Sequence, residues 1–362
     1  MNSIELEKKL EELKKEYSKT KYNKSTDKYL GILRAKMAKI NKALRSKKKR
    51  HGKGFSVKKS GDATVALVGF PNSGKSSLLK ALTGVDTKIA NYAFTTVDLI
   101  PGMLEYKGAK IQIFDVPGLI EGAHVGKGEG TMIASALRVA DLLLFVVDAT
   151  DYSKFNLLLE ELSLLGIRIG NPNLKIDEES NGGIIIVTNG KSVPSDAEIK
   201  EILASFGIYN ANVVFFENST ASDVIDAASG YVFINAIIAL NKVDLLSDYT
   251  SVSSTMEKKN GIKVVPISAL SEFNLEALKE SIFSSLKLIR VFLKPKLNNG
   301  KGEVIILREG STVLDAAIKI HSNLANSIKF AYITGPSAKF KNQKVGKEHM
   351  LMDGDFITIV EK

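Results

Sequence analysis

The feature that most constrains this chain is an eight-residue loop, Gly69-Phe-Pro-Asn-Ser-Gly-Lys-Ser76, which lies between an apolar β-branched run and a helical segment. Its glycines permit a turn tight enough for backbone N–H groups to converge on phosphate oxygens, and the helix that follows adds its positive N-terminus. Lys75 is expected to reach the β- and γ-phosphates, and the Ser76 hydroxyl to ligate Mg²⁺. The alternative, a plain glycine turn, is disfavoured by the strand–turn–helix context. We therefore predict nucleotide binding by Gly69, Phe70, Pro71, Asn72, Ser73, Gly74, Lys75, Ser76 and Ser77.

Apolar β-branched runs alternate with helical segments around this loop and predict an α/β fold with a doubly wound, mainly parallel sheet. The strands are expected near 64–68, 111–114, 142–147, 234–240 and 263–267, and a helix near 275–291. The 126 positions from Asp115 to Asn241 exceed the roughly 60 residues of two strand–helix–strand steps. We assign the excess to a small inserted α+β domain with strands at 184–187 and 213–216 and helices at 197–206 and 221–228.

The two ends of the chain differ from this α/β body. Residues 4–18 and 28–46 each carry an apolar stripe at helical spacing, which predicts a helical hairpin. The C-terminal part, with strands near 303–307, 330–334 and 356–360 and a helix near 313–321, predicts a small β-grasp-like domain.

Charge is concentrated at one of these ends. The whole chain has a net charge of +10, but residues 1–60 hold 20 Lys and Arg against 6 Asp and Glu, whereas the other 302 residues hold 30 against 34. A basic arm on a near-neutral body predicts binding to a polyanion. We expect RNA, in particular ribosomal RNA, to be held through its phosphates. Few aromatic residues stand among these lysines, so base stacking is not expected. The candidate contacts are Arg45, Lys47, Lys48, Lys49, Arg50, Lys339, Lys341, Lys344 and Lys347.

Composition excludes several other classes of protein. The chain has no cysteine, which excludes disulfides, thiolate metal sites and cysteine nucleophiles. No window approaches the roughly 18–20 apolar residues of a membrane span, and the N-terminus lacks the apolar region of a signal peptide. We expect a cytoplasmic protein that does not bind membranes.

Asp115-Val-Pro-Gly118 ends the strand that follows the phosphate loop in the predicted sheet. An acid at this edge can hold a Mg²⁺-bound water, and the Gly118 N–H can meet the γ-phosphate. The ten residues 121–130 include four glycines and suit a nucleotide-dependent switch. Between the loop and Asp115, a threonine of the pair Thr95-Thr96 can complete the Mg²⁺ shell, although an ordinary strand-edge pair explains these residues equally well.

Asn241-Lys-Val-Asp244 follows another apolar strand and predicts guanine as the base. The Asp244 carboxylate can accept hydrogen bonds from both the ring N–H and the exocyclic amine of guanine, and adenine offers no such pair. Backbone N–H groups of Ser268-Ala-Leu270, after the next strand, would face the guanine oxygen. The predicted nucleotide-binding set therefore also includes Asp115, Gly118, Asn241, Lys242, Asp244, Ser268, Ala269 and Leu270.

With these motifs in place, the chain resembles the developmentally regulated GTP-binding protein family, in its archaeal-like form, within the Obg-related GTPases. The resemblance extends over nearly the whole chain and includes Tyr92-Ala-Phe-Thr-Thr96, the residues from Asp115 to Gly122, and Lys344-Val-Gly-Lys-Glu-His349. It implies a basic helical region at 1–60, a GTPase domain at 61–167 and 233–292, an inserted domain resembling ribosomal S5 domain-2-like folds at 168–232, and a TGS domain at 293–362.

The resemblance also implies a role for particular residues and partners. Thr96 becomes the better Mg²⁺ candidate beside Ser76, with Asp115 acting through water. Lys75, Thr96, Gly118 and Asn72 are the expected catalytic residues. The expected partners are GTP and GDP, a ribosome or RNA, and a regulatory protein of the family, with the chain itself a monomer.

Two positions depart from common GTPase patterns. Leu119 stands where many GTPases use a glutamine to orient the attacking water, so slow intrinsic hydrolysis is expected. Asn72 follows Pro71 as in potassium-stimulated GTPases, and we hypothesise that it helps hold K⁺ against the phosphates; the alternative is that it only shapes a Pro-Asn turn.

We therefore predict a GTP-hydrolysing switch protein that acts in translation. The alternative function is an RNA- or partner-binding scaffold in which the nucleotide is mainly structural, and a kinase is a distant third.

Overall fold

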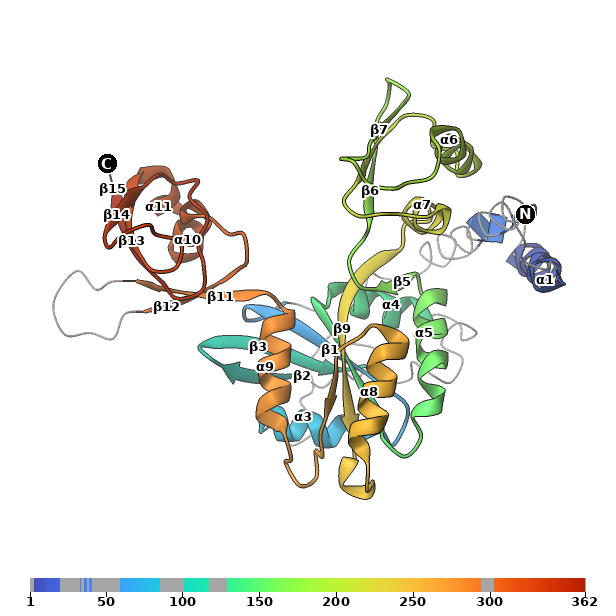
Figure 1. The fold of residues 1–362 in the computed structure, drawn as a ribbon, viewed down its shortest axis with the longest axis horizontal. Helices are drawn as coiled ribbons and strands as arrows, with labels where there is room; N and C mark the ends of the chain where they lie inside the picture. The colour runs from blue at the N-terminus through green and yellow to red at the C-terminus, as the bar shows by residue number, and fades with distance from the viewer. Residues whose placement is uncertain are drawn as a thin grey trace. The chain divides into compact units, whose positions relative to one another are not determined.

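The computed structural model describes residues 3–19, 33, 36, 37, 39, 40, 59–84, 101–116, 129–293 and 303–361 (Figure 1). Its largest sheet has the strand order β10-β9-β4-β1-β3-β2, with β5 paired to β9. The hairpin of β2 and β3 is antiparallel, whereas β1 runs parallel to β3 and β4, and β9 parallel to β5 and β10. The predicted doubly wound, mainly parallel sheet is therefore confirmed. The strands are β1 Ala63–Val68, β2 Pro101–Tyr106, β3 Ala109–Asp115, β4 Leu142–Asp148, β5 Ile167–Ile169, β9 Val232–Asn241 and β10 Val264–Pro266.

The central strands are uniformly apolar because both of their faces are covered. All six residues of β1 are buried, as are the first six of β4. Leucines of α3 share one buried cluster with residues of α9 and one face of the sheet. The helices of this part are α3 Lys75–Thr83, α4 Glu129–Val139, α5 Phe155–Leu164, α8 Tyr249–Asn260 and α9 Leu275–Ser285, with single 3₁₀ turns at Tyr152–Lys154 and Val243–Leu245.

The helix predicted over 275–291 is wrong beyond residue 285. Helix α9 ends at Ser285, and Lys287 adopts a left-handed φ of 51°, which ends helical hydrogen bonding. The next residues form strand β11, Leu288–Leu293, which pairs with β12 and β15 in a separate sheet.

This separate sheet has the strand order β12-β11-β15-β13-β14. Its core joins apolar residues of β11, β12, β13 and β15 to Val313 and Ala316 of α10, as expected of a β-grasp arrangement. The remaining elements are β12 Val304–Arg308, α10 Val313–Ile320, α11 Ser322–Ser327, β13 Ile328–Thr334, β14 Gln343–Val345 and β15 Asp355–Glu361.

Ion pairs join this C-terminal sheet to the large sheet. Asp62, immediately before β1, pairs with Lys319 of α10 at 2.9 Å, and Asp141, immediately before β4, pairs with Arg308 of β12 at 2.8 Å. Each aspartate also accepts a backbone N–H, from Lys110 and Thr64 respectively. The contacts therefore lie at the amino-terminal ends of these parallel strands.

The segment between β5 and β9 forms a three-stranded sheet of order β6-β8-β7, with its own buried cluster. The two strands and two helices predicted here are present within two residues of their expected bounds. Strand β6 was not predicted, because its sequence Leu-Lys-Ile-Asp-Glu is largely charged and pairs at a sheet edge. The elements are β6 Leu174–Glu178, β7 Ile184–Val187, α6 Asp196–Ser205, β8 Ala211–Phe215 and α7 Ala221–Ala228.

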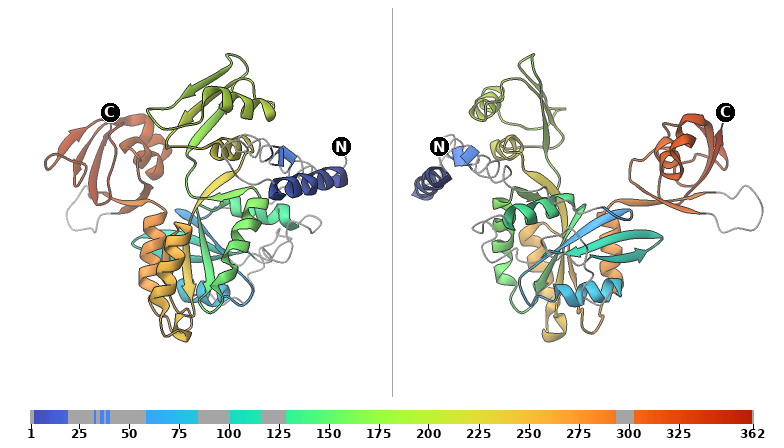
Figure 2. Two further views of the ribbon diagram at one scale, coloured as in Figure 1. Left: turned by 45° about the vertical axis from the view of Figure 1, so that its right-hand side comes forward. Right: turned by 180° about the vertical axis from the view of Figure 1, so that it is seen from behind.

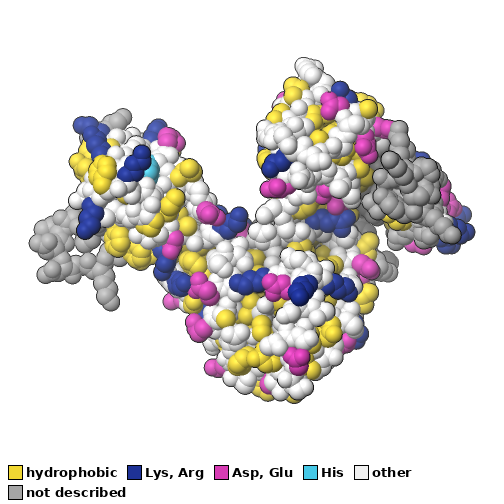
Figure 3. Space-filling view, viewed as in Figure 1, with side chains coloured by type: hydrophobic (Ala, Val, Ile, Leu, Met, Phe, Trp, Pro, Cys, Tyr) yellow, Lys and Arg dark blue, Asp and Glu magenta, His cyan; other side chains and the backbone are white. Residues whose placement is uncertain are grey.

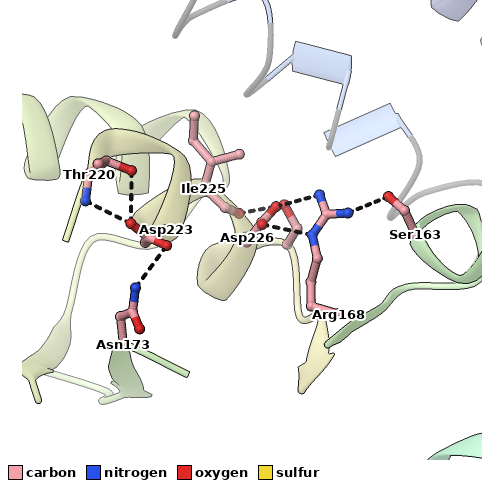
Figure 4. A network of polar contacts seen from close by, with 8 residues as sticks. Ser163, Arg168, Asn173, Thr220, Asp223, Ile225 and Asp226 are labelled. Carbon is pink, nitrogen blue, oxygen red and sulfur yellow. Dashed lines mark hydrogen bonds and ion pairs between the residues drawn. The ribbon is translucent and has the colours of Figure 1, made fainter. Parts of the chain in front are cut away.

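A polar network lies where this segment joins the rest of its part of the chain (Figure 4). The Arg168 guanidinium of β5 donates from Nε and Nη2 to both carboxylate oxygens of Asp226 at 2.8 and 3.1 Å, and it also donates to the Ser163 hydroxyl. Its Cζ lies 4.3 Å from the centre of the Tyr231 ring. One side chain thus ties the entering strand to the residues that leave the inserted segment.

Helix α1, Ser3–Lys19, lies near the N-terminus (Figure 2). It carries the predicted apolar stripe. Leu6, Leu10 and Leu13 are buried in one cluster with Leu33 and Ile40. Most of the second predicted helix lies outside the described residues. Among the helices that the structure describes, none has both the length and the apolar character needed to cross a bilayer.

Candidate nucleotide-binding site

The predicted phosphate loop connects the carboxyl end of β1 to the first turn of α3. The Ser73 N–H donates to the Phe70 carbonyl at 3.3 Å, which closes a turn with Pro71 and Asn72 at its centre. Asn72 has a φ of 62°, the left-handed conformation that asparagine tolerates and that this turn requires. Asn72 therefore does shape a Pro-Asn turn, as the alternative to a K⁺ site proposed. The Asn72 side chain is exposed.

Both loop glycines are required by close packing. A side chain at Gly69 would collide with the Val146 carbonyl of β4, and one at Gly74 would collide with the Asn241 side chain. Gly74 also has a φ of 94°. The loop therefore lies tightly against β4 and β9, the strands that carry the other predicted motifs.

Lys75 and Asp115 face each other beneath this loop. The Lys75 ammonium donates to the carbonyls of Gly69 at 2.8 Å and Phe70 at 3.0 Å. Burial lowers the pKa of Lys75, and the charge of Asp115 opposes that shift. Burial raises the pKa of Asp115, and Lys75 together with a hydrogen bond from Ser76 opposes that shift.

The oxygen atoms beside Lys75 fit a hydrated divalent cation. Asp115 Oδ1 and the Ser73 hydroxyl are buried and have no hydrogen-bond partner within the described residues. An unpaired buried polar atom costs about 1–3 kcal/mol, so a ligand or water that pairs with it is favoured. The Ser76 hydroxyl and the Asp115 carboxylate supply the hard oxygen donors that Mg²⁺ prefers. Thr96 and Gly118, predicted for the same site, lie outside the described residues.

Asn241 joins the phosphate loop to the predicted guanine loop. Its side chain is buried, and its Nδ2 donates to the Ser73 carbonyl at 2.9 Å while its Oδ1 accepts from the Ala269 N–H at 2.9 Å. Both ends of the amide are thus engaged within the protein. In this arrangement Asn241 acts as a brace between two loops.

The other predicted base-binding residues lie on the same edge of the sheet. Asp244 is exposed in the 3₁₀ turn after β9, and its carboxylate has no hydrogen-bond partner among the residues described. The Ser268 N–H donates to the Phe273 carbonyl, so the N–H groups of Ser268 and Ala269 are already bonded. A guanine oxygen at this position would accept a second hydrogen bond from one of these two N–H groups, or a hydrogen bond from the N–H of Leu270. The Leu270 side chain is 89% exposed.

One residue of this edge was missed by the sequence analysis. Asp148, at the end of β4, accepts a hydrogen bond from the Lys242 ammonium at 2.6 Å and from Thr150 at 2.7 Å. Burial raises the pKa of Asp148, but these hydrogen bonds outweigh burial and hold the pKa below its ordinary value. The signal was available, because an acid directly after an apolar parallel strand is the same pattern that identified Asp115.

The predicted RNA contacts divide between two regions. Arg45, Lys47, Lys48, Lys49 and Arg50 lie outside the described residues. Lys339, Lys341, Lys344 and Lys347 are exposed in and around β14 of the C-terminal sheet. Their role stays a prediction.

Three family models match successive stretches of the chain. A family described as 50S ribosome-binding GTPase matches residues 64–189, the C-terminal region of that GTPase domain matches 181–288, and the TGS domain matches 289–361. Among solved structures, a GTP-binding protein from Pyrococcus horikoshii covers 83% of this chain and 100% of its own at 18% identity, with a TM-score of 0.46.

Sequence relatives extend over nearly the full length. Developmentally-regulated GTP-binding protein 1 of Xenopus laevis is 39% identical, covering 97% of this chain and 98% of its own. Developmentally-regulated G-protein 3 of Arabidopsis thaliana is also 39% identical, covering 98% of both chains. An uncharacterized GTP-binding protein of Methanocaldococcus jannaschii is 41% identical, covering 99% of this chain and 93% of its own. This chain therefore belongs to the family of developmentally regulated GTP-binding proteins, which are P-loop GTPases with a C-terminal TGS domain.

Proposed function

We propose that this GTPase is a nucleotide-dependent switch that acts with ribosomes or RNA in translation, in the cytoplasm. The proposed binding of a guanine nucleotide is supported mainly by Asn241, whose two hydrogen bonds join the phosphate loop to the predicted guanine loop. The ribosomal part is supported by the exposed lysines of the TGS domain and by the match to a family described as ribosome-binding GTPases. The proposed partners are a ribosome or RNA and a regulatory protein of the family, with the GTPase itself a monomer.

Each residue of the site has a proposed role in binding and hydrolysis. Loop N–H groups and the Lys75 ammonium neutralise the β- and γ-phosphates, and Asp244 accepts the two guanine N–H groups. Ser76 holds Mg²⁺ directly and Asp115 holds it through water, with Thr96 as a further ligand and Gly118 at the γ-phosphate. When bound, Mg²⁺ neutralises charge that develops on the phosphate oxygens. Leu119 offers no group to orient water, so we expect slow intrinsic hydrolysis.

Ribosome co-sedimentation in different nucleotide states tests the switch. Binding should be stronger with a non-hydrolysable GTP analogue than with GDP or without nucleotide. The Asp244→Asn variant should lose this difference, because it weakens guanine recognition and leaves the lysines of the TGS domain intact. Equal sedimentation of the unmodified chain in all three states would favour the scaffold alternative, in which the nucleotide is mainly structural.

We further propose that K⁺ stimulates hydrolysis through the Asn72 side chain. GTP turnover should be faster in K⁺ than in Na⁺ at matched ionic strength. Asn72→Gly is the informative variant, because glycine accepts the left-handed φ of 62° and removes the side chain without disturbing the turn. This variant should retain GTP binding and lose the preference for K⁺. If the unmodified protein turned over equally in both salts, Asn72 would serve the turn alone.

A further inference from the structure

The TGS sheet has one face that α10 does not cover. Alternate residues of a strand point to opposite faces. Val291, Ala331, Ile333 and Ile357 are fully buried against the α10 side. Their neighbours along the strands, Phe292, Phe330, Tyr332 and Phe356, therefore point to the opposite face, which we call the outer face.

The outer face is rich in aromatic rings. Phe292 of β11 stacks on Phe356 of β15 with centroids 4.9 Å apart, and Phe330 of β13 meets Tyr332 edge-on at 5.2 Å. Phe356 is 42% exposed and Tyr332 is 39% exposed. The register places Tyr332 opposite Thr358 of β15, and Thr334 opposite Phe356, so the rings occupy adjacent rows of one surface.

A positive charge lies directly among these rings. Lys344 of β14 is paired in register with Tyr332, and its ammonium lies 4.2 Å from the centre of the Phe330 ring. The surrounding segment 335–347 has four lysines and no acidic residue. Figure 3 shows hydrophobic and basic side chains side by side over the TGS domain, at the upper left.

Within the described residues, the GTPase domain packs against this face along its β12 edge. Ile306 of β12 belongs to the buried cluster of the GTPase domain, and Val304 lies beside the turn at Gly108. The strands β13, β15 and β14 lie on the other side of β11. On these strands Tyr332, Phe356 and Lys344 are exposed, while the β12 edge is packed.

We propose that the outer face of the TGS sheet binds unpaired RNA bases, which stack on Tyr332 and Phe356 while Lys344 pairs with the adjoining phosphate. Base–aromatic stacking accepts any base, and a cation beside the rings matches the charge of the nucleic-acid backbone. An apolar protein surface would leave the Lys344 ammonium desolvated and unpaired, which is costly. The proposal deepens the RNA role proposed above and depends on it.

Base stacking was not expected from the sequence, because few aromatic residues stand among the lysines. The rings come from β11, β13 and β15, and only the sheet register brings them beside Lys344. Because these residues are far apart in the sequence, their spacing along the chain gave no sign of the outer face.

The test is fluorescence anisotropy of the full chain with a labelled unstructured ten-nucleotide RNA and with a duplex of the same length. The single strand should bind more tightly than the duplex. Tyr332→Ala and Phe356→Leu should each weaken single-strand binding by about tenfold, the lower range of stacking losses. Tyr332→Phe should bind normally, because it retains the ring. Tyr209→Ala, which removes a tyrosine that is 66% exposed in the inserted segment, should also bind normally.

Lys344→Ala should weaken binding and reduce the salt dependence by about one phosphate contact. GTP affinity of each variant reports whether the chain is folded, and Phe356→Leu retains an apolar side chain in case Tyr332→Ala does not fold. Equal binding of duplex and single strand, or normal binding by both ring variants, would overturn the proposal. Ribosome sedimentation that is independent of nucleotide, with the ring effects intact, would instead refute only the proposed switch.

Discussion

Replacing Asn241 by alanine should destabilise the nucleotide-free protein strongly, although the substitution removes only a small amide. The side chain is 2% exposed and makes one hydrogen bond in each direction, to the Ser73 carbonyl and from the Ala269 N–H. Alanine leaves both backbone groups unpaired in a buried site. At about 1–3 kcal/mol for each of the two orphaned groups, the expected loss in the free energy of unfolding is about 2–6 kcal/mol.

Asn241→Asp is the matched control for this prediction. Aspartate can still accept from the Ala269 N–H, but it cannot donate to the Ser73 carbonyl and places a charge beside it. The aspartate variant should therefore lose the link to the phosphate loop and retain the link to the guanine loop.

Urea unfolding followed by circular dichroism measures the total loss, and hydrogen exchange of amides in β1 and β9 assigns it to the GTPase domain. In Asn241→Asp, exchange should increase around residue 73 and change little around residue 269. A loss below about 0.5 kcal/mol in Asn241→Ala, with unchanged exchange in both loops, would refute the assignment of a bracing role.

Three further predictions rest on single contacts. Asp115→Asn should stabilise the nucleotide-free chain near neutral pH and impair GTP hydrolysis. Burial raises the pKa of Asp115 in the folded state, so the unmodified chain loses stability as pH rises through that pKa, and the variant does not. Calorimetry across pH checks this, and equal pH profiles would contradict it. Asp148→Asn should lower the free energy of unfolding by about 1 kcal/mol at neutral pH, because the Asp148 carboxylate is charged there and its contact with Lys242 stabilises the fold. The pKa of Asp148 is lowered in the folded state, so the difference between the two proteins should vanish as pH falls through that pKa. An unchanged melting temperature at pH 7 would argue against it. Asp226→Asn should weaken the Arg168 contact by about 1–2 kcal/mol and speed hydrogen exchange in β5 and α7, whereas Glu178→Gln on β6 should not; equal exchange in both variants would count against this role.

The sequence predicted the large sheet and the position of the nucleotide motifs because both follow from local patterns. A glycine-rich loop after an apolar strand, and acids or amides at the ends of neighbouring parallel strands, meet at one edge of a sheet whatever the rest of the chain does. Asn241 and Ser73 are 168 residues apart, and the strand ends alone place them side by side.

What could not be predicted depends on contacts between distant segments. The helix pattern of 275–291 continues past Ser285, and only the pairing of β11 with β12 and β15 makes the later residues a strand. The pairing of Asp148 with Lys242 and the aromatic outer face likewise depend on which strands are neighbours. Hydrophobic spacing within one segment contains no information on that choice.

The ion pairs at Asp62 and Asp141 have a consequence for how the two ends of the GTPase sheet can influence each other. The phosphate loop follows the carboxyl end of β1, whereas Asp62 precedes its amino end, and six strand residues span about 20 Å. The Debye length at physiological salt is about 8 Å, so through solvent the charge of a γ-phosphate is largely screened over that distance. Displacement of the packed strands can therefore carry an influence of the bound nucleotide to the TGS domain where direct charge attraction through solvent cannot, and added salt should weaken that influence by weakening the ion pairs at which the strands meet the TGS domain.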